Sequence, residues 1–207
     1  WRSQKVVQTP PTPFHLLILG DSLAQGVGSV ENENTLEKYL TDKLRPLHTT
    51  FTVENKAVPS SKTEEVLNDQ LTKLYLEHYS ATILFIGTND ITRLVTPSNF
   101  ENNYAEIAKV LSTKSDLVVL ANIPQFSNTP IVPKTIQVIV DSRTKSYNNK
   151  IDNIANGYQN LRIFNFFAFS QNRLQGEINY IADDGFHPND AGYRLIGEEI
   201  TQKIIGQ

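Results

Sequence analysis

The chain has 207 residues, of which 39% are hydrophobic and 20% charged, and its formal net charge is −3. This length suits one folded domain with a substantial core. No basic stripe marks it as a partner of nucleic acid, and no apolar run approaches the ~18–20 residues of a membrane span. The lack of cysteine excludes disulfides, a thiol nucleophile and thiolate metal ligands.

The first residues differ in composition from the rest of the chain. Residues 1–13 are polar and contain three prolines within four positions, which favours an extended tether. Methionine is absent even at position 1, so we expect the numbered chain to begin inside a longer one. A removed signal or anchor segment would make the protein extracytoplasmic; an ordinary terminal arm on a cytoplasmic protein is the alternative. We therefore take residues 1–13 as an arm and 14–207 as a single domain.

Apolar runs and amphipathic segments alternate along this domain. The runs predict strands, and the segments with helical spacing predict helices between them. Strands are expected at residues 14–19, 51–58, 81–86, 117–121 and 161–164. Helices are expected at about 35–45, 63–75, 98–111, 135–155 and from about 190 onward. Strands that alternate with helices in this way imply right-handed crossovers and a parallel sheet covered on both faces.

Two of the predicted helices have apolar residues whose spacing assigns them to the core. In the second helix these are Val66, Leu67, Leu71, Leu74 and Tyr75. In the fourth helix they are Ile136, Ile139, Val140, Tyr147, Ile151 and Ile154. The aromatic run at residues 164–169 is expected to supply core and a pocket wall. The long loops at residues 122–133 and 170–181 are where substrate choice is expected to reside.

Polar clusters directly follow three of the predicted strands. They are Gly20-Asp21-Ser22, Pro59-Ser60-Ser61 and Gly87-Thr88-Asn89-Asp90. The carboxyl ends of parallel strands share one edge of the sheet, so the three clusters should converge on one cleft. A fourth polar segment, Asp184-Gly185-Phe186-His187, lies just before the last helix.

These clusters contain the groups that acyl transfer requires. The Ser22 hydroxyl can act as nucleophile, His187 can take its proton, and Asp184 can fix the imidazole tautomer. Candidate donors to an oxyanion are the backbone N–H groups of Ser22 and Ser60 and the side-chain amide of Asn89.

The segments Gly20-Asp21-Ser22-Leu23, Gly87-Thr88-Asn89-Asp90 and Asp184-Gly185-Phe186-His187 resemble the ordered motif blocks of the SGNH, or GDSL, hydrolases. The resemblance runs from about Phe14 to the final helix. It implies a flavodoxin-like three-layer α/β/α domain with a five-stranded parallel sheet of order 2-1-3-4-5. By the family's pattern, Ser22 is the nucleophile, His187 the base and Asp184 its partner, and Asn89 is an oxyanion donor.

The remaining motif positions include supporting residues and one departure. Gly20, Asp21, Gly87 and Asp90 are expected to shape and order the loops of the site. Ser60 stands where the family has glycine. A serine keeps the backbone N–H, but it is strained if the position requires a positive φ.

We therefore expect a serine esterase that releases a short acyl or acetyl group through an acyl-enzyme, with a carbohydrate or lipid ester as substrate. An O-acyltransferase that acts on a carbohydrate is the alternative, and an inactive binding domain is a further one. No cofactor is expected, because the G-x-G-x-x-G spacing is missing. No metal is expected either, because Asp183, Asp184 and Asp190 lack paired histidines or a calcium-loop spacing.

Overall fold

The computed structural model of the chain describes residues 12–30, 34–174 and 180–206. The predicted arm at residues 1–13 lies outside this description except for its last two residues. In the described ranges, every helix is too short or too polar to cross a membrane.

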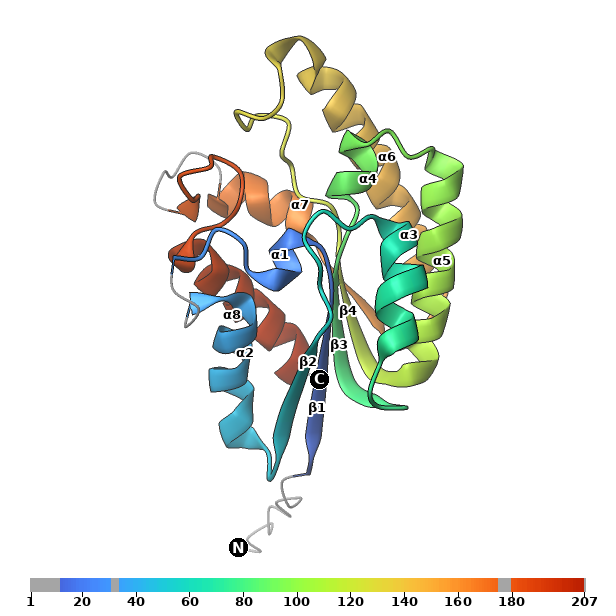
Figure 1. The fold of residues 1–207 in the computed structure, drawn as a ribbon, viewed down its shortest axis with the longest axis vertical. Coiled ribbons are helices and arrows are strands. Elements are labelled where there is room, and N and C mark those ends of the chain that lie inside the picture. Colours follow the sequence, from blue (N-terminus) through green and yellow to red (C-terminus); the bar gives the residue numbers. More distant parts are fainter. Residues whose placement is uncertain (1–11, 31–33, 175–179, 207) are drawn as a thin grey trace, which may run out of the picture.

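Five parallel strands form one sheet of order β2-β1-β3-β4-β5 (Figure 1). The strands are β1 Phe14–Gly20, β2 Phe51–Asn55, β3 Tyr79–Phe85, β4 Ser115–Ala121 and β5 Leu161–Phe164. Helices cover both faces, and α2 and α8 lie on the opposite side of the sheet from α3, α5 and α6. The predicted flavodoxin-like architecture and strand order are therefore confirmed.

The helices differ widely in length. The α-helices are α1 Ser22–Gln25, α2 Leu36–Leu44, α3 Thr63–Glu65, α4 Thr88–Thr92, α5 Pro97–Lys114, α6 Gln137–Ala155, α7 Phe166–Phe169 and α8 Asp190–Ile205. Short 3-10 turns lie at Arg45–Leu47, Leu71–Lys73 and Lys134–Ile136. π-Helical turns lie at Val66–Gln70 and Ser170–Leu174. The predicted N-cap of α2 is confirmed, because the Thr35 side chain accepts a hydrogen bond from the Lys38 N–H.

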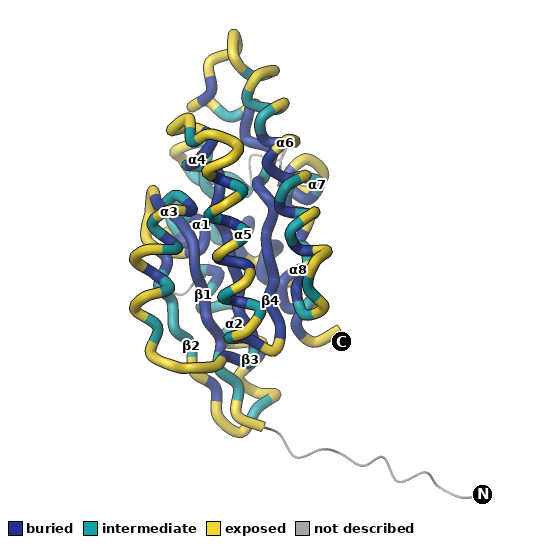
Figure 2. Tube along the Cα trace, turned by 90° about the vertical axis from the view of Figure 1, so that its right-hand side faces the viewer, coloured by how far each residue is buried: buried dark blue, intermediate teal, exposed yellow. Residues whose placement is uncertain are grey.

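Strand β1 is the centre of the core and is buried on both faces (Figure 2). Leu16 and Ile18 pack in the cluster shared with α2 and α8. Leu17 and Leu19 pack in the cluster shared with α5 and α6. A strand with apolar contacts on both faces has a continuous apolar sequence, which is the pattern seen here. Its carboxyl end is consequently held firmly in place.

The second strand is shorter than predicted, because it ends at Asn55 rather than at residue 58. The Asn55 side-chain oxygen accepts a hydrogen bond from the Ala57 N–H at 3.0 Å, which turns the chain locally. The Val58 N–H still donates to the Gly20 carbonyl at 3.1 Å. The loop that leads to Ser60 is therefore attached directly to the end of β1.

The helix predicted at residues 63–75 was wrong in its regularity and in the position of Tyr75. Only α3 is α-helical, and a π turn and a 3-10 turn follow it. The wider π turn holds Gln70 in the interior. Tyr75 is 81% exposed, with its ring 3.5 Å from the Lys56 ammonium group. Tyr75 therefore covers a lysine at the surface and does not enter the core.

The first turns of α6 are also more exposed than predicted. Tyr147 and Ile151 face the core as expected, but Ile136 is 42% exposed and Ile139 is 60% exposed. The segment from the 3-10 turn into α6 projects beyond the carboxyl edge of the sheet (Figure 1). Helical spacing defines an apolar face there, but the sheet does not extend far enough to cover it.

Substitution of Gly20 tests the close approach of β1 to β3. A Cβ atom at Gly20 would lie 1.9 Å from the Phe85 carbonyl oxygen, and φ is +136°. We expect Gly20→Ala to lower the free energy of unfolding by about 3 kcal/mol or more. Denaturant unfolding measures this, with Gly157→Ala as the control, for which a change within about 1 kcal/mol is expected. Equal losses in the two variants would contradict the steric argument.

Candidate active site

The nucleophile candidate lies where β1 turns into α1. The Asp21 N–H donates to the Phe85 carbonyl at 3.0 Å, which ties the turn to β3. The Asp21 carboxylate caps α1 by accepting from the Leu23 N–H at 3.1 Å. Ser22 is the first residue of α1, so its own N–H has no partner within the helix. This turn presents both the hydroxyl and the N–H of Ser22 at the edge of the sheet.

His187 and Asp184 lie together in the loop before α8. The Ala182 N–H donates to the His187 carbonyl at 2.9 Å, which closes the loop. His187 Nδ1 lies 2.6 Å from an Asp184 carboxylate oxygen, and His187 Nε2 lies 2.9 Å from the Ser22 hydroxyl. Ser22 and His187 are 165 residues apart in the sequence. The structure thus brings together the three residues predicted as a catalytic triad.

The Asp184 carboxylate is held by the backbone of its own loop. One oxygen accepts from the Phe186 and His187 N–H groups at 2.8 and 2.9 Å, and the other faces the imidazole. Partial burial acts to raise the pKa of Asp184, but the hydrogen bonds from His187 and Phe186 outweigh it and lower that pKa below its usual value. The carboxylate is therefore ionised at neutral pH and can stabilise an imidazolium.

A set of hydrogen bonds to Asp190, which we call the clamp, connects the loop after α1 to the start of α8. Asp190, at the start of α8, accepts from the Ser29 hydroxyl at 2.6 Å, the Val30 N–H at 2.9 Å and the Asn34 amide at 3.0 Å. The first two donors lie in the loop after α1. The clamp therefore attaches the loop that follows Ser22 to the helix that follows His187.

Ser60 has a backbone conformation that favours glycine. Its φ is +67°, in the left-handed region that favours glycine, and the residue is exposed. A non-glycine residue in this region is typically strained by about 1–2 kcal/mol. The strain expected for a serine with positive φ is thus present at this position.

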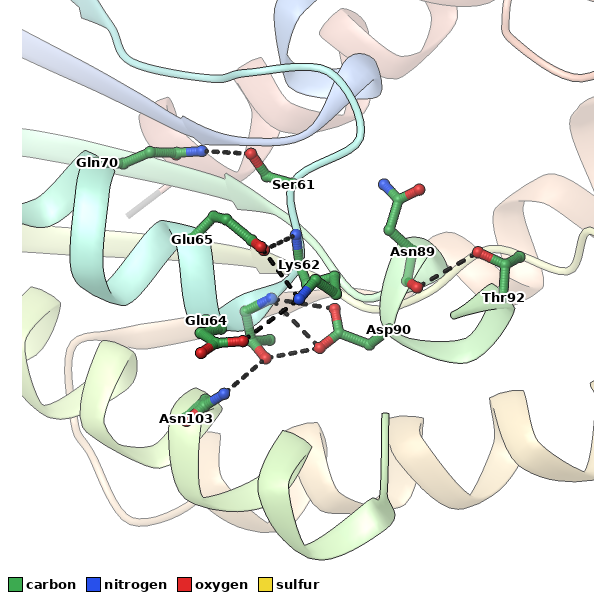
Figure 3. A network of polar contacts seen from close by, with 10 residues as sticks. Ser61, Lys62, Glu64, Glu65, Gln70, Asn89, Asp90, Thr92 and Asn103 are labelled. Carbon is green, nitrogen blue, oxygen red and sulfur yellow. Dashed lines mark hydrogen bonds and ion pairs between the residues drawn. The ribbon is translucent and has the colours of Figure 1, made fainter. Parts of the chain in front are cut away.

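Buried polar side chains join the three strand-end loops beneath the site (Figure 3). Gln70 bonds both the N–H and the carbonyl of Gly20, at 2.9 and 2.8 Å, and donates to the Ser61 hydroxyl at 3.2 Å. Asp90 accepts from the Thr63 N–H at 3.1 Å and from its hydroxyl at 2.6 Å. Buried hydrogen bonds therefore link the loops that carry Ser22, Ser60 and Asn89 to one another.

Asn89 and Asp21 form the link between α4 and the nucleophile turn. The Asn89 amide donates to an Asp21 carboxylate oxygen at 3.3 Å, which leaves the second amide hydrogen available to a ligand. Burial raises the pKa of Asp21 to about 7, and the nearby Asp90 adds to this effect, while hydrogen bonds from Leu23 and Asn89 oppose it. Burial likewise raises the pKa of Asp90 to about 6, against its hydrogen bonds from Thr63.

An apolar cavity of about 490 Å³ adjoins the triad. Its wall includes Phe126 and Leu174 from the two long loops and Phe166 from the aromatic run, which was predicted to supply a pocket wall. That the two loops determine substrate choice stays a prediction. Phe186 connects the cavity to the base, because its ring lies edge-on to the rings of both His187 and Phe126, with centroids 4.8 and 6.3 Å apart. The cavity can therefore take an apolar group of a molecule that reacts at Ser22.

Sequence reasoning missed two residues that organise the site. Gln70 lies in an amphipathic pattern without a special signal, since only the π turn directs it inward. Asp190 was weighed only as a metal ligand, although its position at a helix start could have indicated a cap or a clamp. No group of three histidine or acidic side chains suited to a metal ion occurs within residues 12–30, 34–174 and 180–206.

A Ser–His–Asp arrangement at the carboxyl edge of a parallel sheet is characteristic of serine hydrolases. The model of the GDSL-like lipase/acylhydrolase family matches residues 18–195, and the chain belongs to that family. It is accordingly a hydrolase of ester bonds, of an acyl class that the family does not specify. No curated protein matches the chain.

Solved structures show the same fold. TesA is 18% identical, with a TM-score of 0.74 over 93% of this chain and 98% of TesA. The acetylxylan esterase Axe2 from Geobacillus stearothermophilus is 16% identical, with a TM-score of 0.74 over 96% and 97% of the two chains. The psychrotrophic esterase EstA from Pseudoalteromonas sp. is 21% identical, with a TM-score of 0.70 over 92% and 96%.

Substitutions of Ser60 test the strain at the motif glycine position. Ser60→Gly keeps the N–H and removes the strain, so we expect a free energy of unfolding no lower than that of the parent. Ser60→Val places a β-branched residue at φ +67° and should lower it by about 1–2 kcal/mol. Denaturant unfolding compares the two. Equal stability of the glycine and valine variants would argue against strain at this position.

The raised pKa of Asp21 predicts a dependence of stability on pH. The folded state binds this proton more tightly than the unfolded state, whose pKa is near the ordinary 3.8. The proton on Asp21 therefore stabilises the folded state fully below the unfolded-state pKa of 3.8. This stabilisation is lost as pH rises through the folded-state pKa of about 7. We expect the melting temperature of Asp21→Asn, measured relative to that of the parent, to increase as pH rises from about 4 to about 8.

The control for this measurement is Asp69→Asn, a substitution of an exposed carboxylate whose ion-pair partner, Lys73, keeps its charge over this pH range. Its melting-temperature difference from the parent should stay nearly constant over the same pH range. A difference for Asp21→Asn that is also constant with pH would contradict the raised pKa.

Proposed function

We propose that the chain is a serine esterase in which Ser22 attacks the ester carbonyl and becomes acylated. The observation that carries the proposal is the pair of contacts made by His187, from Nε2 to the Ser22 hydroxyl at 2.9 Å and from Nδ1 to Asp184 at 2.6 Å. Both lie within the range for proton transfer and for orientation of a general base.

His187 Nε2 takes the hydroxyl proton as Ser22 Oγ bonds to the carbonyl carbon, and Asp184 stabilises the imidazolium. The imidazolium then protonates the departing alcohol oxygen, which leaves an ester on Ser22. A water molecule, activated by the same imidazole, releases the acid and restores the hydroxyl. The Ser22 and Ser60 N–H groups and the Asn89 amide are the proposed donors to the oxyanion, each of which typically contributes about 10²–10³-fold in rate.

The acyl group of the substrate is the second part of the proposal. A short acyl or acetyl group stays a prediction, and it rested on the lack of an apolar groove in the sequence pattern. The cavity beside Phe186 supports a different assignment, because its wall is mostly apolar and it contacts the imidazole through that ring. We propose that the cavity holds the acyl chain, so that the preferred chain has several carbons.

Hydrolysis of p-nitrophenyl esters of increasing acyl length tests both the proposed triad and the proposed preference for acyl chains of several carbons. We expect Ser22→Ala and His187→Ala to lower kcat by about 10⁴-fold or more. Ser98→Ala, at an exposed position on α5, is the matched control and should keep parental turnover. For the parent, kcat/KM should rise from acetate to longer acyl chains because more apolar surface is buried in the cavity.

Each alternative has its own outcome. Turnover that survives Ser22→Ala would refute the triad, and a folded parent without turnover would favour an inactive binding domain. A preference for acetate would restore the short acyl group and assign the cavity to the alcohol. Formation of acylated sugar on addition of a sugar acceptor would favour the O-acyltransferase.

A further inference from the structure

Exposed aliphatic side chains gather at one end of the molecule. Five of the eleven large hydrophobic side chains that the described residues expose lie within two short segments. We call this set the apolar tip; its members are Leu94, Ile131, Ile136, Val138 and Ile139. Exposed apolar residues scattered singly need no explanation, whereas a cluster marks a surface that contacts something.

The two segments of the apolar tip lie side by side. Helix α4, which ends just before Leu94, packs against α6. The Arg143 guanidinium donates to the Val95 carbonyl at 2.8 Å, and the Tyr147 hydroxyl donates to the same oxygen. Ile139 and Arg143 are one helical turn apart on one face of α6. The chain beside Leu94 is therefore held about one helical turn from Ile139. Val138 and Ile139 are exposed on α6, and Ile136 is exposed in the 3-10 turn before it.

The apolar tip is continuous with the apolar cavity. Phe126, Thr129 and Pro130 line the cavity, and Ile131 is the next residue of the same loop. The start of α6 lies beyond the carboxyl edge of the sheet, at the end where α1 and α7 are found (Figure 1), and residues of α1 and α7, Leu23 and Phe166, line the cavity. A surface that holds the apolar tip would thus lie close to the cavity beside His187.

The two segments that carry the apolar tip contain cations and no acidic residue, although the half-buried Asp141 follows the second segment directly. The segments 91–99 and 123–140 contain no acidic residue, and their charged residues are Arg93 and Lys134, both exposed. The chain as a whole has a net charge of −3. Cations beside exposed aliphatic side chains suit a surface with an apolar interior and anionic headgroups.

We propose that the apolar tip docks on a lipid surface with anionic headgroups and thereby brings a lipid ester to the cavity. The second half of this inference rests on the proposed esterase activity, and the first half does not. The tip contains only Leu, Ile and Val among its large apolar residues, whereas the centres of protein interfaces are enriched in aromatic residues and methionine. The start of α6, which carries Val138 and Ile139, also projects beyond the sheet (Figure 1).

Sedimentation with vesicles tests the docking. We expect the parent to sediment with vesicles of phosphatidylcholine mixed with phosphatidylserine, and less with phosphatidylcholine alone. The double variant Val138→Ser/Ile139→Ser should bind the mixed vesicles at least about tenfold more weakly than the parent. Two aliphatic side chains that leave water when the parent binds are missing from the variant. Lys134→Gln should weaken binding about fivefold, the typical contribution of one cation near an anionic surface.

The controls have equally exposed side chains at the amino edge of the sheet. They are Leu47→Ser and Lys73→Gln, which should bind like the parent. All four variants should hydrolyse dissolved p-nitrophenyl acetate at the parental rate, because none is in the candidate active site. A parent without esterase activity that still binds vesicles would overturn the proposed function and leave the docking intact.

Three results would overturn the docking. The parent could fail to sediment with either type of vesicle. The tip variants could bind no more weakly than their controls. Gel filtration could show that the parent self-associates and that Val138→Ser/Ile139→Ser does not, which would assign the apolar tip to a second copy of the chain.

Discussion

The site depends on the peptide unit of Gly20, where β1 ends. Its N–H and carbonyl both bond the Gln70 amide, and its carbonyl also accepts from the Val58 N–H. The next N–H, that of Asp21, bonds the Phe85 carbonyl, at a distance from β3 that leaves no room for a side chain on residue 20. One backbone position thus fixes the β1, β2 and β3 loops relative to one another. The proposed oxyanion donors on these loops are therefore held in place by the fold itself, and such preorganisation is the condition for electrostatic catalysis.

Several residues that prepare the site lower the stability of the fold, through burial of a carboxyl group or through backbone strain. Asp21 and Asp90 are almost fully buried, and burial raises the pKa values of both. Ser60 keeps a conformation that favours glycine. Such local costs persist only where the surrounding structure determines the geometry, and they are common at functional sites. The buried bonds of Gln70 with Ser61 and of Asp90 with Thr63 supply that determination here.

The sequence predicted the parallel sheet because strands such as β1 are apolar throughout and end in glycine and polar residues, whereas the strand order was implied only by the resemblance to the GDSL hydrolases. It predicted which residues would meet at the edge because parallel strands share that edge. It could not predict the exposure of Tyr75 or Ile139. Periodicity identifies an apolar face but not whether another element covers it, and a π turn changes which residues share a face. Gln70 had no signal, since its role arises only from the tertiary structure.

The contacts of Asp190 can open at a lower temperature than the one at which the whole domain unfolds. The partners of Asp190, Ser29, Val30 and Asn34, lie at the rim, outside the two apolar clusters that hold the sheet. Rim contacts open at a lower free energy than core contacts. Gentle warming would therefore loosen the rim beside Ser22 and His187 while the sheet is still intact. Heat inactivation would begin below the melting transition and would reverse on cooling.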